Sequence, residues 1–338
     1  MAIPHNKPTL GKEEADASAR VIHKGWIAQG PEVGTFEDEL CKWFDLPVGH
    51  AVVVSSGSAA LYFALVTLQA KGKRVGVPVY SCSALTNAVH LVGAKAVFLD
   101  TALDSPNFDP QAAKTAKLDI LIAPSIFGIP TNHIDMPGLY VIEDIAQSFG
   151  ARSNGEHIGI RGDIGVCSFY ATKMFTTGGQ GGAVISRDLS LIEAVRDMRQ
   201  FDGRADRHPR FNFQITDMQA AVGREQLKRL PKLIDKRETL FKIYRSKGLP
   251  LLEAPSQIEQ PVRFRAVIRC KRPKKIIEIL RQQEVHAIIP VEPFEILAPE
   301  SDCPNSYNLA RTTLSLPIFP DLNEIEAQRI AEIVSKNI

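Results

Sequence analysis

The 338-residue sequence lacks an excess of charge of either sign, because 40 Lys and Arg residues stand against 38 Asp and Glu residues, a formal net charge of +2. It therefore has no overall basic field that would favour nucleic acid or an anionic membrane surface as a partner. No apolar run approaches the ~20 residues that a transmembrane helix needs. The N-terminus, M-A-I-P-H-N-K-P, contains no apolar signal-peptide core. We expect a soluble, cytoplasmic protein that binds neither nucleic acid nor membrane.

Cysteine is sparse as well. The five cysteines stand singly, without a C-x-x-C pair, and no H-E-x-x-H segment is present. These patterns predict reduced thiols and no metal site. The sequence also has no G-x-x-x-x-G-K-[ST] loop, and its G-G-Q-G-G at residues 178–182 precedes an apolar run instead of opening a helix. This order argues against a nucleotide-binding dehydrogenase, whose glycine fingerprint lies between a strand and a helix.

Apolar runs recur through the first half of the chain and are separated by helical or loop segments. The runs are continuous, not alternating, which is typical of a mostly parallel sheet that helices bury on both faces. The fold class predicted is therefore α/β. The runs occupy residues 51–54, 75–80, 94–99, 120–126 and 139–142.

The last third of the chain has a different pattern. A long helical pattern over residues 215–244 is followed by an expected strand at 262–269, a helix at 273–283 and a short strand at 286–290. We expect a large domain over residues 1–240 and a smaller C-terminal α+β domain over residues 241–338.

A single lysine, Lys173, follows the apolar run 164–170 and precedes the apolar run 183–186. This order predicts strand, turn, strand. Lysine is almost never fully buried without a partner, so Lys173 needs one. A carboxylate or water at a loop tip would satisfy it. Alternatively, a desolvated amine loses its charge easily and forms a Schiff base with a carbonyl group.

Two further segments supply an anion-binding turn and a carboxylate. The strand at 51–54 passes through S-S-G-S into a helix whose first amides, near Gly57 and Ser58, can bind phosphate or simply be capped by serine. The run 139–142 brings Asp144, beside Glu143, to the carboxyl edge of the sheet, where ligands bind. A helix cap or a salt bridge would also explain a carboxylate there. An amine, a carboxylate and a phosphate-binding turn are the three groups that pyridoxal 5′-phosphate requires.

Several segments, in this order and at this spacing, resemble the DegT/StrS sugar aminotransferases, which are fold-type I pyridoxal-phosphate-dependent enzymes. The resemblance spans nearly the whole chain and implies the fold-type I architecture. The segments are G-W-I-A-Q-G-P-E-V-G-T-F-E, S-S-G-S-A-A-L, I-E-D-I-A-Q-S-F-G-A, S-F-Y-A-T-K followed by G-G-Q-G-G-A-V, and F-N-F-Q-I-T-D-M-Q-A-A-V-G-R-E-Q-L.

The resemblance implies a role for each matched residue. Lys173 would bond covalently to the cofactor and then act as general base and acid, while Asp144 would keep the pyridine nitrogen protonated. Gln147 would lie close to the phenolic oxygen of the cofactor. The phosphate would be bound by Gly57, Ser58 and Ser168, with Asn212 reaching it from the second subunit of a homodimer with shared active sites.

The sequence departs from the family pattern at three places. The aromatic residue that stacks on the cofactor in many members falls on Cys82, which we therefore count among the cofactor-binding candidates. Tyr170 stands where a histidine is frequent. The segment after Pro290 lacks a histidine-bearing substrate loop, which leaves open whether the substrate carries a nucleotide.

Together these features predict a pyridoxal-phosphate-dependent aminotransferase that moves an amino group from L-glutamate to a keto-sugar. We expect a nucleotide-linked substrate in amino-sugar or surface-polysaccharide biosynthesis. The alternatives are an aminotransferase acting on a non-nucleotide keto-sugar or a cyclitol, and a non-catalytic relative that binds the cofactor. A sugar dehydratase is disfavoured, because that branch of the family has histidine in place of the lysine.

Overall fold

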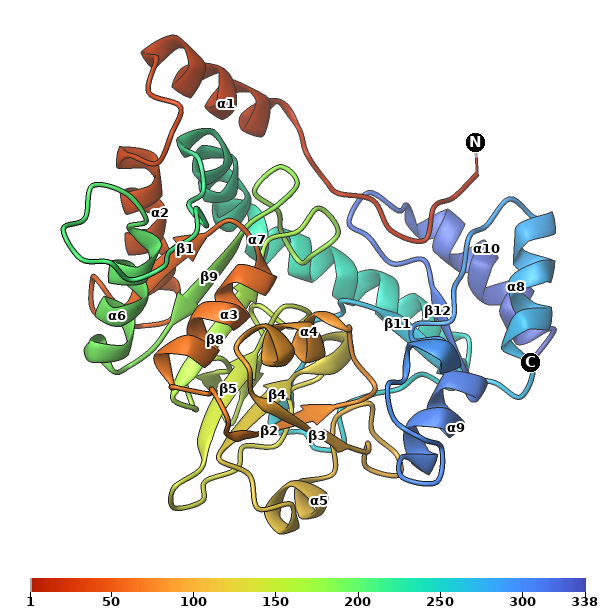
Figure 1. Cartoon of the computed structure of the whole chain (residues 1–338). Coiled ribbons are helices and arrows are strands. Elements are labelled where there is room, and N and C mark those ends of the chain that lie inside the picture. The colour runs from red at the N-terminus through yellow and green to blue at the C-terminus, as the bar shows by residue number, and fades with distance from the viewer. Residues whose placement is uncertain (1) are drawn as a thin grey trace.

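A seven-stranded sheet forms the centre of the computed structural model, which describes residues 2–338 (Figure 1). The strand order is β1-β9-β8-β5-β4-β2-β3. Strand β9 runs antiparallel to β1 and β8, and the other neighbouring pairs are parallel. The sheet is therefore mostly parallel, as predicted. Its strands are β1 (Ala51–Val54), β2 (Arg74–Pro78), β3 (Lys95–Leu99), β4 (Ile120–Pro124), β5 (Tyr140–Asp144), β8 (Ile164–Ser168) and β9 (Gly182–Ile185).

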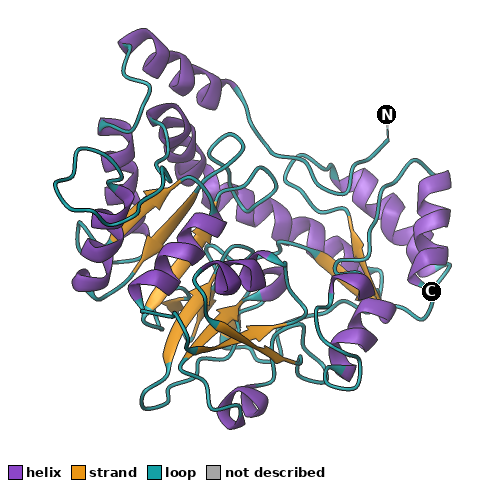
Figure 2. Cartoon of the chain, viewed as in Figure 1, coloured by secondary structure: helices purple, strands orange, loops and turns teal. Residues whose placement is uncertain are grey.

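Helices cover both faces of this sheet (Figure 2). Alternate side chains of β1 show the two faces, because Val53 packs in one buried cluster while Val52 and Val54 pack in another. No helix within residues 2–338 is long and apolar enough to cross a membrane. The helices are α1 (Lys12–Lys24), α2 (Pro31–Trp43), α3 (Gly57–Thr67), α4 (Ala84–Leu91), α5 (Pro110–Thr115), α6 (Leu189–Arg199), α7 (Asp217–Ser246), α8 (Pro273–Gln282), α9 (Pro304–Thr312) and α10 (Glu324–Ser335), with short 3₁₀ turns η1 (Ile126–Gly128) and η2 (Pro293–Glu295).

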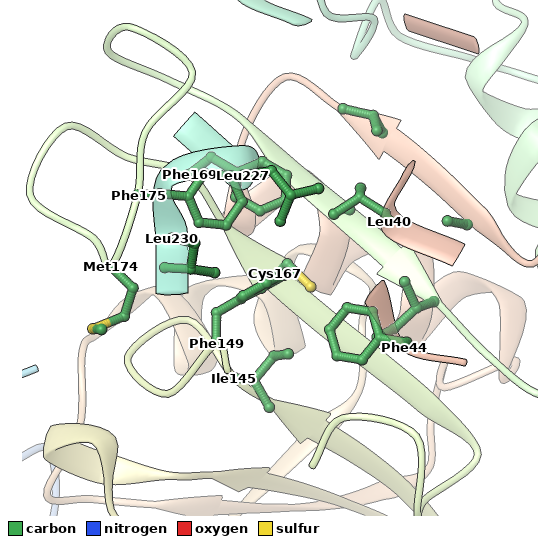
Figure 3. Packing of buried hydrophobic residues seen from close by; sticks show 14 of the residues in the cluster. Leu40, Phe44, Ile145, Phe149, Cys167, Phe169, Met174, Phe175, Leu227 and Leu230 are labelled. Atoms are coloured by element: carbon green, nitrogen blue, oxygen red, sulfur yellow. The ribbon is translucent and has the colours of Figure 1, made fainter. Parts of the chain in front are cut away.

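The first of these clusters is rich in phenylalanine and lies between the sheet and helices α2 and α7 (Figure 3). The Phe149 and Phe175 rings pack edge to face with their centroids 4.9 Å apart, and the centroid of the Phe169 ring lies 4.8 Å from that of Phe175. Aromatic pairs in this range favour tilted and T-shaped contacts. Because Phe169 and Phe175 flank the turn that carries Lys173, this cluster fixes both ends of that turn.

The C-terminal residues form their own buried cluster around the antiparallel pair β11 (Ala266–Arg269) and β12 (Thr313–Leu316), with helices α8 and α10. Helix α7 packs in both clusters, since Leu230 belongs to the first and Tyr244 to the C-terminal one. The predicted boundary between residues 240 and 241 falls inside this helix and stays a prediction. A second small sheet joins β6 (Arg152–Ser153), β7 (Glu156–His157) and β10 (Glu259–Gln260).

Two expectations for this region need correction. The predicted strand at 286–290 does not form; Ile288 makes only an isolated bridge with Ser315, and Pro290 has no backbone N–H to extend a ladder. The predicted strand at 262–269 begins only at Ala266. The preceding backbone is held elsewhere, because the Val262 N–H donates to the carbonyl of Gly128 at 3.0 Å.

Candidate functional site

A pocket of about 230 Å³ opens at the carboxyl ends of β4, β5 and β8 and at the N-terminus of α3. Its position agrees with the rule that ligands of α/β sheets bind at the carboxyl ends of the strands. The pocket brings together every predicted site residue except Asn212. The predicted residues that line it are Gly57, Ser58, Cys82, Asp144, Gln147, Ser168 and Lys173.

The backbone of the turn around Lys173 is held by local hydrogen bonds. After β8 ends, the Phe169 N–H donates to Gly181 at 2.8 Å, and the Lys173 N–H donates to the Tyr170 carbonyl at 2.9 Å. The Thr176 hydroxyl donates to the Phe169 carbonyl at 3.0 Å and so closes the turn. The lysine is therefore presented to the pocket from a rigid support.

Lys173 and Asp144 are both withdrawn from solvent, and each affects the ionisation of the other. Burial lowers the pKa of Lys173 below its usual 10.5, an effect that the negative charge of Asp144 opposes. Burial also raises the pKa of Asp144 above its usual 3.8, which the Ala146 N–H at 2.9 Å and Lys173 oppose. The two side chains do not form an ion pair, since their charged atoms are more than 4.0 Å apart, and both line the pocket.

Asp144 and its neighbour Glu143 have different surroundings, because successive side chains of a strand point to opposite faces. Glu143 forms a buried ion pair with Arg161, with a guanidinium nitrogen 2.6 Å from Oε1. Its Oε2 accepts the N–H groups of Gly159, Arg161 and Gly162 at 3.0, 2.8 and 3.1 Å. The salt bridge that the sequence left open for a carboxylate at this edge therefore belongs to Glu143, and Asp144 is the one that lines the pocket.

The N-terminus of α3 provides an anion cradle. Ser56 caps the helix, since its side chain accepts the Ala59 N–H at 3.1 Å and its carbonyl accepts the Ala60 N–H at 3.0 Å. The N–H groups of Gly57 and Ser58 have no hydrogen-bond partner within residues 2–338. Free amides at a helix N-terminus are suited to a phosphate group.

Ser168, at the end of β8, faces this cradle. A Cβ atom added to Gly57 would lie 2.8 Å from the Ser168 Cβ and 3.1 Å from its Oγ. The helix N-terminus and the serine hydroxyl therefore approach each other more closely than any residue but glycine allows at position 57. A small anion in the cradle could be bound by amides from α3 and by the hydroxyl from β8.

Gln147 is oriented by the loop after β4. Its Oε1 accepts the backbone N–H of Phe127 at 2.9 Å, where Phe127 has a φ of 59°. Because the amide oxygen is used in this way, the amide nitrogen is the group that Gln147 can offer to a ligand.

The roles of two predicted residues, Cys82 and Asn212, do not follow from the contacts within one chain. Cys82 lies on the pocket wall with an exposed side chain, and its contact with the cofactor ring stays a prediction. Asn212 lies in an exposed loop outside the pocket, where its Oδ1 accepts the Gln214 N–H at 3.1 Å. Its contact with a second subunit stays a prediction.

Other pocket residues were not predicted. Three of these, Ser81, Ser125 and Ile126, follow β2 and β4, so the rule that placed Asp144 at a strand end would also have indicated them. Gln180 lies in the glycine-rich turn itself. Phe264 does not line the pocket, but the centre of its ring lies 5.5 Å from the Lys173 Nζ. It comes from the C-terminal half of the chain, and no local pattern relates it to the lysine.

Comparison with known proteins agrees with this arrangement. A model of the DegT/DnrJ/EryC1/StrS aminotransferase family matches residues 8–335. The chain is 32% identical to dTDP-3-amino-3,4,6-trideoxy-alpha-D-glucose transaminase of Streptomyces venezuelae, over 96% of this chain and 92% of that protein. It is also 32% identical to GDP-perosamine synthase of Vibrio cholerae, over 74% and 72% of the two chains. The crystal structure of S. venezuelae DesV in complex with a ketimine intermediate matches with a TM-score of 0.88 and 30% identity, over 96% of this chain and 94% of that one.

The architecture is thus that of the fold-type I pyridoxal-phosphate-dependent transferases, as the sequence predicted. More narrowly, the chain belongs to the DegT/DnrJ/EryC1/StrS aminotransferase family. Both the fold class and the family resemblance are confirmed.

Replacing Glu143 by alanine should destabilise the protein, because Arg161 would be left buried without its counter-charge and three N–H groups would lose their acceptor. We expect the free energy of unfolding to fall by about 3–5 kcal/mol. Glu253→Ala is the matched control, since its ion pair with Arg245 is exposed and such pairs contribute about 0–1 kcal/mol. Urea unfolding followed by circular dichroism measures both. Equal losses in the two variants would contradict the structural role of Glu143.

Proposed function

We propose that this aminotransferase moves an amino group from L-glutamate to a keto-sugar, with pyridoxal 5′-phosphate bound in the pocket described above. The observation that carries the proposal is the placement of Lys173, Asp144 and the free amides of Gly57 and Ser58 around one pocket. An amine with a lowered pKa, a buried carboxylate and a phosphate cradle are the groups this cofactor needs.

The residues present fit the cofactor. Gly57, Ser58 and Ser168 would hold its phosphate, and the close approach of Gly57 to Ser168 leaves this cradle without a side chain to fill it. Asp144 would hold the ring nitrogen, because a buried carboxylate is stabilised by a positively charged partner. Gln147 would donate to the phenolic oxygen. When bound, the cofactor supplies an aldehyde that receives the amino group and a ring that withdraws electrons from the α-carbon of the donor.

Lys173 would be both the attachment point and the proton carrier. Desolvation lowers its pKa, so more of the amine is neutral near pH 7 than for an exposed lysine. A neutral Nζ can accept the proton of the donor's α-carbon and return a proton to a neighbouring carbon.

The proposed acceptor is a nucleotide-linked keto-sugar of amino-sugar or polysaccharide biosynthesis. The support comes from the relatives, whose names refer to a dTDP-linked sugar and to GDP-perosamine. The two different nucleotides leave the base unassigned for this chain.

We also propose a homodimer in which Asn212 of one subunit reaches the phosphate site of the other. Large apolar side chains are exposed on α1 and in the loops that follow it and precede α7. They are Ile22, Trp26, Ile27 and Phe211, with exposed fractions of 55%, 61%, 54% and 61%. A second copy that covers these side chains would remove apolar area from water.

The proposal is tested by the visible absorption spectrum of the purified protein, before and after addition of L-glutamate. We expect a band from the lysine-bound cofactor that disappears as glutamate transfers its amino group. A protein that stays colourless when pyridoxal 5′-phosphate is added would contradict the proposal, and a coloured protein unchanged by glutamate would contradict the donor.

Lys173→Ala should abolish turnover while the fold stays intact, because loss of proton transfer alone costs about 10²–10⁴-fold in rate.

Asp144→Ala should also lower the rate and weaken cofactor binding, since removal of one partner of a buried charge pair costs about 3–5 kcal/mol. Amino transfer is measured by the formation of 2-oxoglutarate, and folding by circular dichroism. Wild-type rates in Lys173→Ala would refute the assignment of this lysine.

Gly57→Ala should weaken binding of pyridoxal 5′-phosphate, because the new Cβ would lie 2.8 Å from the Ser168 Cβ and would displace one wall of the cradle. Gly34→Ala is the matched control, since a Cβ at this helical position meets nothing within 4 Å. Fluorescence titration of the apoprotein gives both dissociation constants. If the two variants bind the cofactor equally well, the phosphate is not held at α3.

A further inference from the structure

The first residues of the chain form a segment that joins the C-terminal region to helix α7. Figure 1 shows this segment running from the C-terminal helices towards α1, and we call residues 3–9 the N-terminal strap. At one end, Ile3 is buried in the C-terminal cluster, and its N–H donates to the Glu284 carbonyl at 2.7 Å. At the other end, the Thr9 carbonyl accepts the side-chain amide of Gln226 on α7 at 2.9 Å. The strap is therefore anchored at both ends.

Between these anchors, Asn6 contacts the turn that carries Lys173. Its side-chain Nδ2 donates to the carbonyl of Thr172 at 3.0 Å, although 166 positions separate the two residues in the sequence. Within residues 2–338, no other side chain hydrogen-bonds to the backbone of Ala171, Thr172 or Lys173. Asn6 thus connects a distant segment of the chain to the residue just before the lysine.

The contact with Asn6 completes the support of one peptide group. The peptide that joins Thr172 to Lys173 has its N–H bonded to the Tyr170 carbonyl at 2.9 Å, and its own carbonyl is bonded to Asn6. Because a peptide group is planar, holding both its N–H and its carbonyl fixes the orientation of the plane. This plane ends at the α-carbon of Lys173, so it limits the directions in which the lysine side chain can leave the backbone.

The strap also borders Lys173 at a second, smaller cavity. The residues that line this cavity include Lys173 and three strap residues, Lys7, Pro8 and Thr9. Its volume of about 10 Å³ is room for about one water molecule, so the strap packs closely against the turn. Lys173 also lines the main pocket. The lysine therefore borders the ligand pocket and the strap at once.

Stability alone does not explain an asparagine at this position of the strap. The Oδ1 of Asn6 is buried and has no hydrogen-bond partner within the described chain. An unpaired buried acceptor destabilises a protein by at least as much as a typical hydrogen bond stabilises it. Proteins keep such costly groups chiefly at functional sites, so the role of Asn6 lies in what its amide nitrogen holds in place.

We propose that Asn6 is a positioning residue for Lys173. Through the Thr172 carbonyl it holds the lysine in the orientation that brings Nζ to the aldehyde carbon of the cofactor. In that step Nζ bonds to this carbon, and the aldehyde oxygen leaves as water with the two protons of the neutral amine. The inference rests on the proposed function, since it requires the cofactor in the pocket. Asn6 does not line the pocket, so it acts through the lysine alone.

The test compares Asn6→Ala and Asn6→Leu with Asn305→Ala. Asn6→Leu keeps most of the side-chain volume but removes the donor. Asn305 is the matched control, because its Nδ2 donates to the Thr101 carbonyl at 2.9 Å, away from the pocket. Pyridoxal 5′-phosphate is added to each apoprotein, and the growth of the absorption band of the lysine-bound cofactor is followed with time. Loss of one hydrogen bond predicts attachment about 3–10-fold slower in both Asn6 variants and a wild-type rate in Asn305→Ala.

A second measurement separates positioning of the lysine from damage to the pocket. Pyridoxamine 5′-phosphate has an amine in place of the aldehyde and cannot bond to Lys173, so its dissociation constant, from fluorescence titration, reports on the pocket alone. We expect this constant to be unchanged in all three variants.

Wild-type attachment rates in the Asn6 variants would overturn the inference. So would slow attachment in Asn6→Ala but not in Asn6→Leu, which would assign Asn6 to packing, or weaker binding of pyridoxamine 5′-phosphate in both Asn6 variants. A wild-type protein that binds neither form of the cofactor would instead refute the proposed function.

Discussion

The rest of the site depends on one electrostatic constraint. The amine of Lys173 and the carboxylate of Asp144 are both withdrawn from solvent and influence each other's charge. Each group is desolvated, and each partly offsets the cost of the other's charge without closing an ion pair. A pair in contact would neutralise itself and leave no room between the charges. A separated pair keeps an amine that gives up its proton readily and a carboxylate that needs a cation. A ligand that satisfies both groups is stabilised by the same electrostatics.

The scaffold keeps these two groups apart by placing them on different supports. Asp144 ends a central strand of the sheet, and the strand is anchored through Glu143 to the loop at Arg161. Lys173 belongs to a turn whose flanking phenylalanines, Phe169 and Phe175, pack in the aromatic cluster beneath the sheet. Neither support can shift without disturbing a buried ion pair or a closely packed core.

Much of this arrangement follows from local sequence patterns. The apolar runs locate the strands to within a few residues. The rule that ligands bind at the carboxyl ends of strands predicted Asp144 as a site residue, and the S-S-G-S turn predicted Gly57. Both line the pocket. What the patterns could not provide depends on contacts between distant segments. The position of Phe264 near Lys173 and the different surroundings of neighbouring Glu143 and Asp144 are decided by tertiary packing.

The same limit explains the strand expected at 286–290. An apolar tripeptide before a proline looks like a strand until its partner is known. Site residues that meet the sheet at strand ends can be predicted from sequence. Contacts from the C-terminal region, such as that of Phe264 with Lys173, cannot, because no local pattern relates the two segments.

The central claim is that Lys173 carries the cofactor. Reduction of the cofactor-loaded protein with borohydride would make that linkage permanent, and mass spectrometry of its peptides would locate it. The account predicts a pyridoxyl group on the peptide that contains Lys173 and on no other. A label on another lysine, or none after loading with pyridoxal 5′-phosphate, would contradict it.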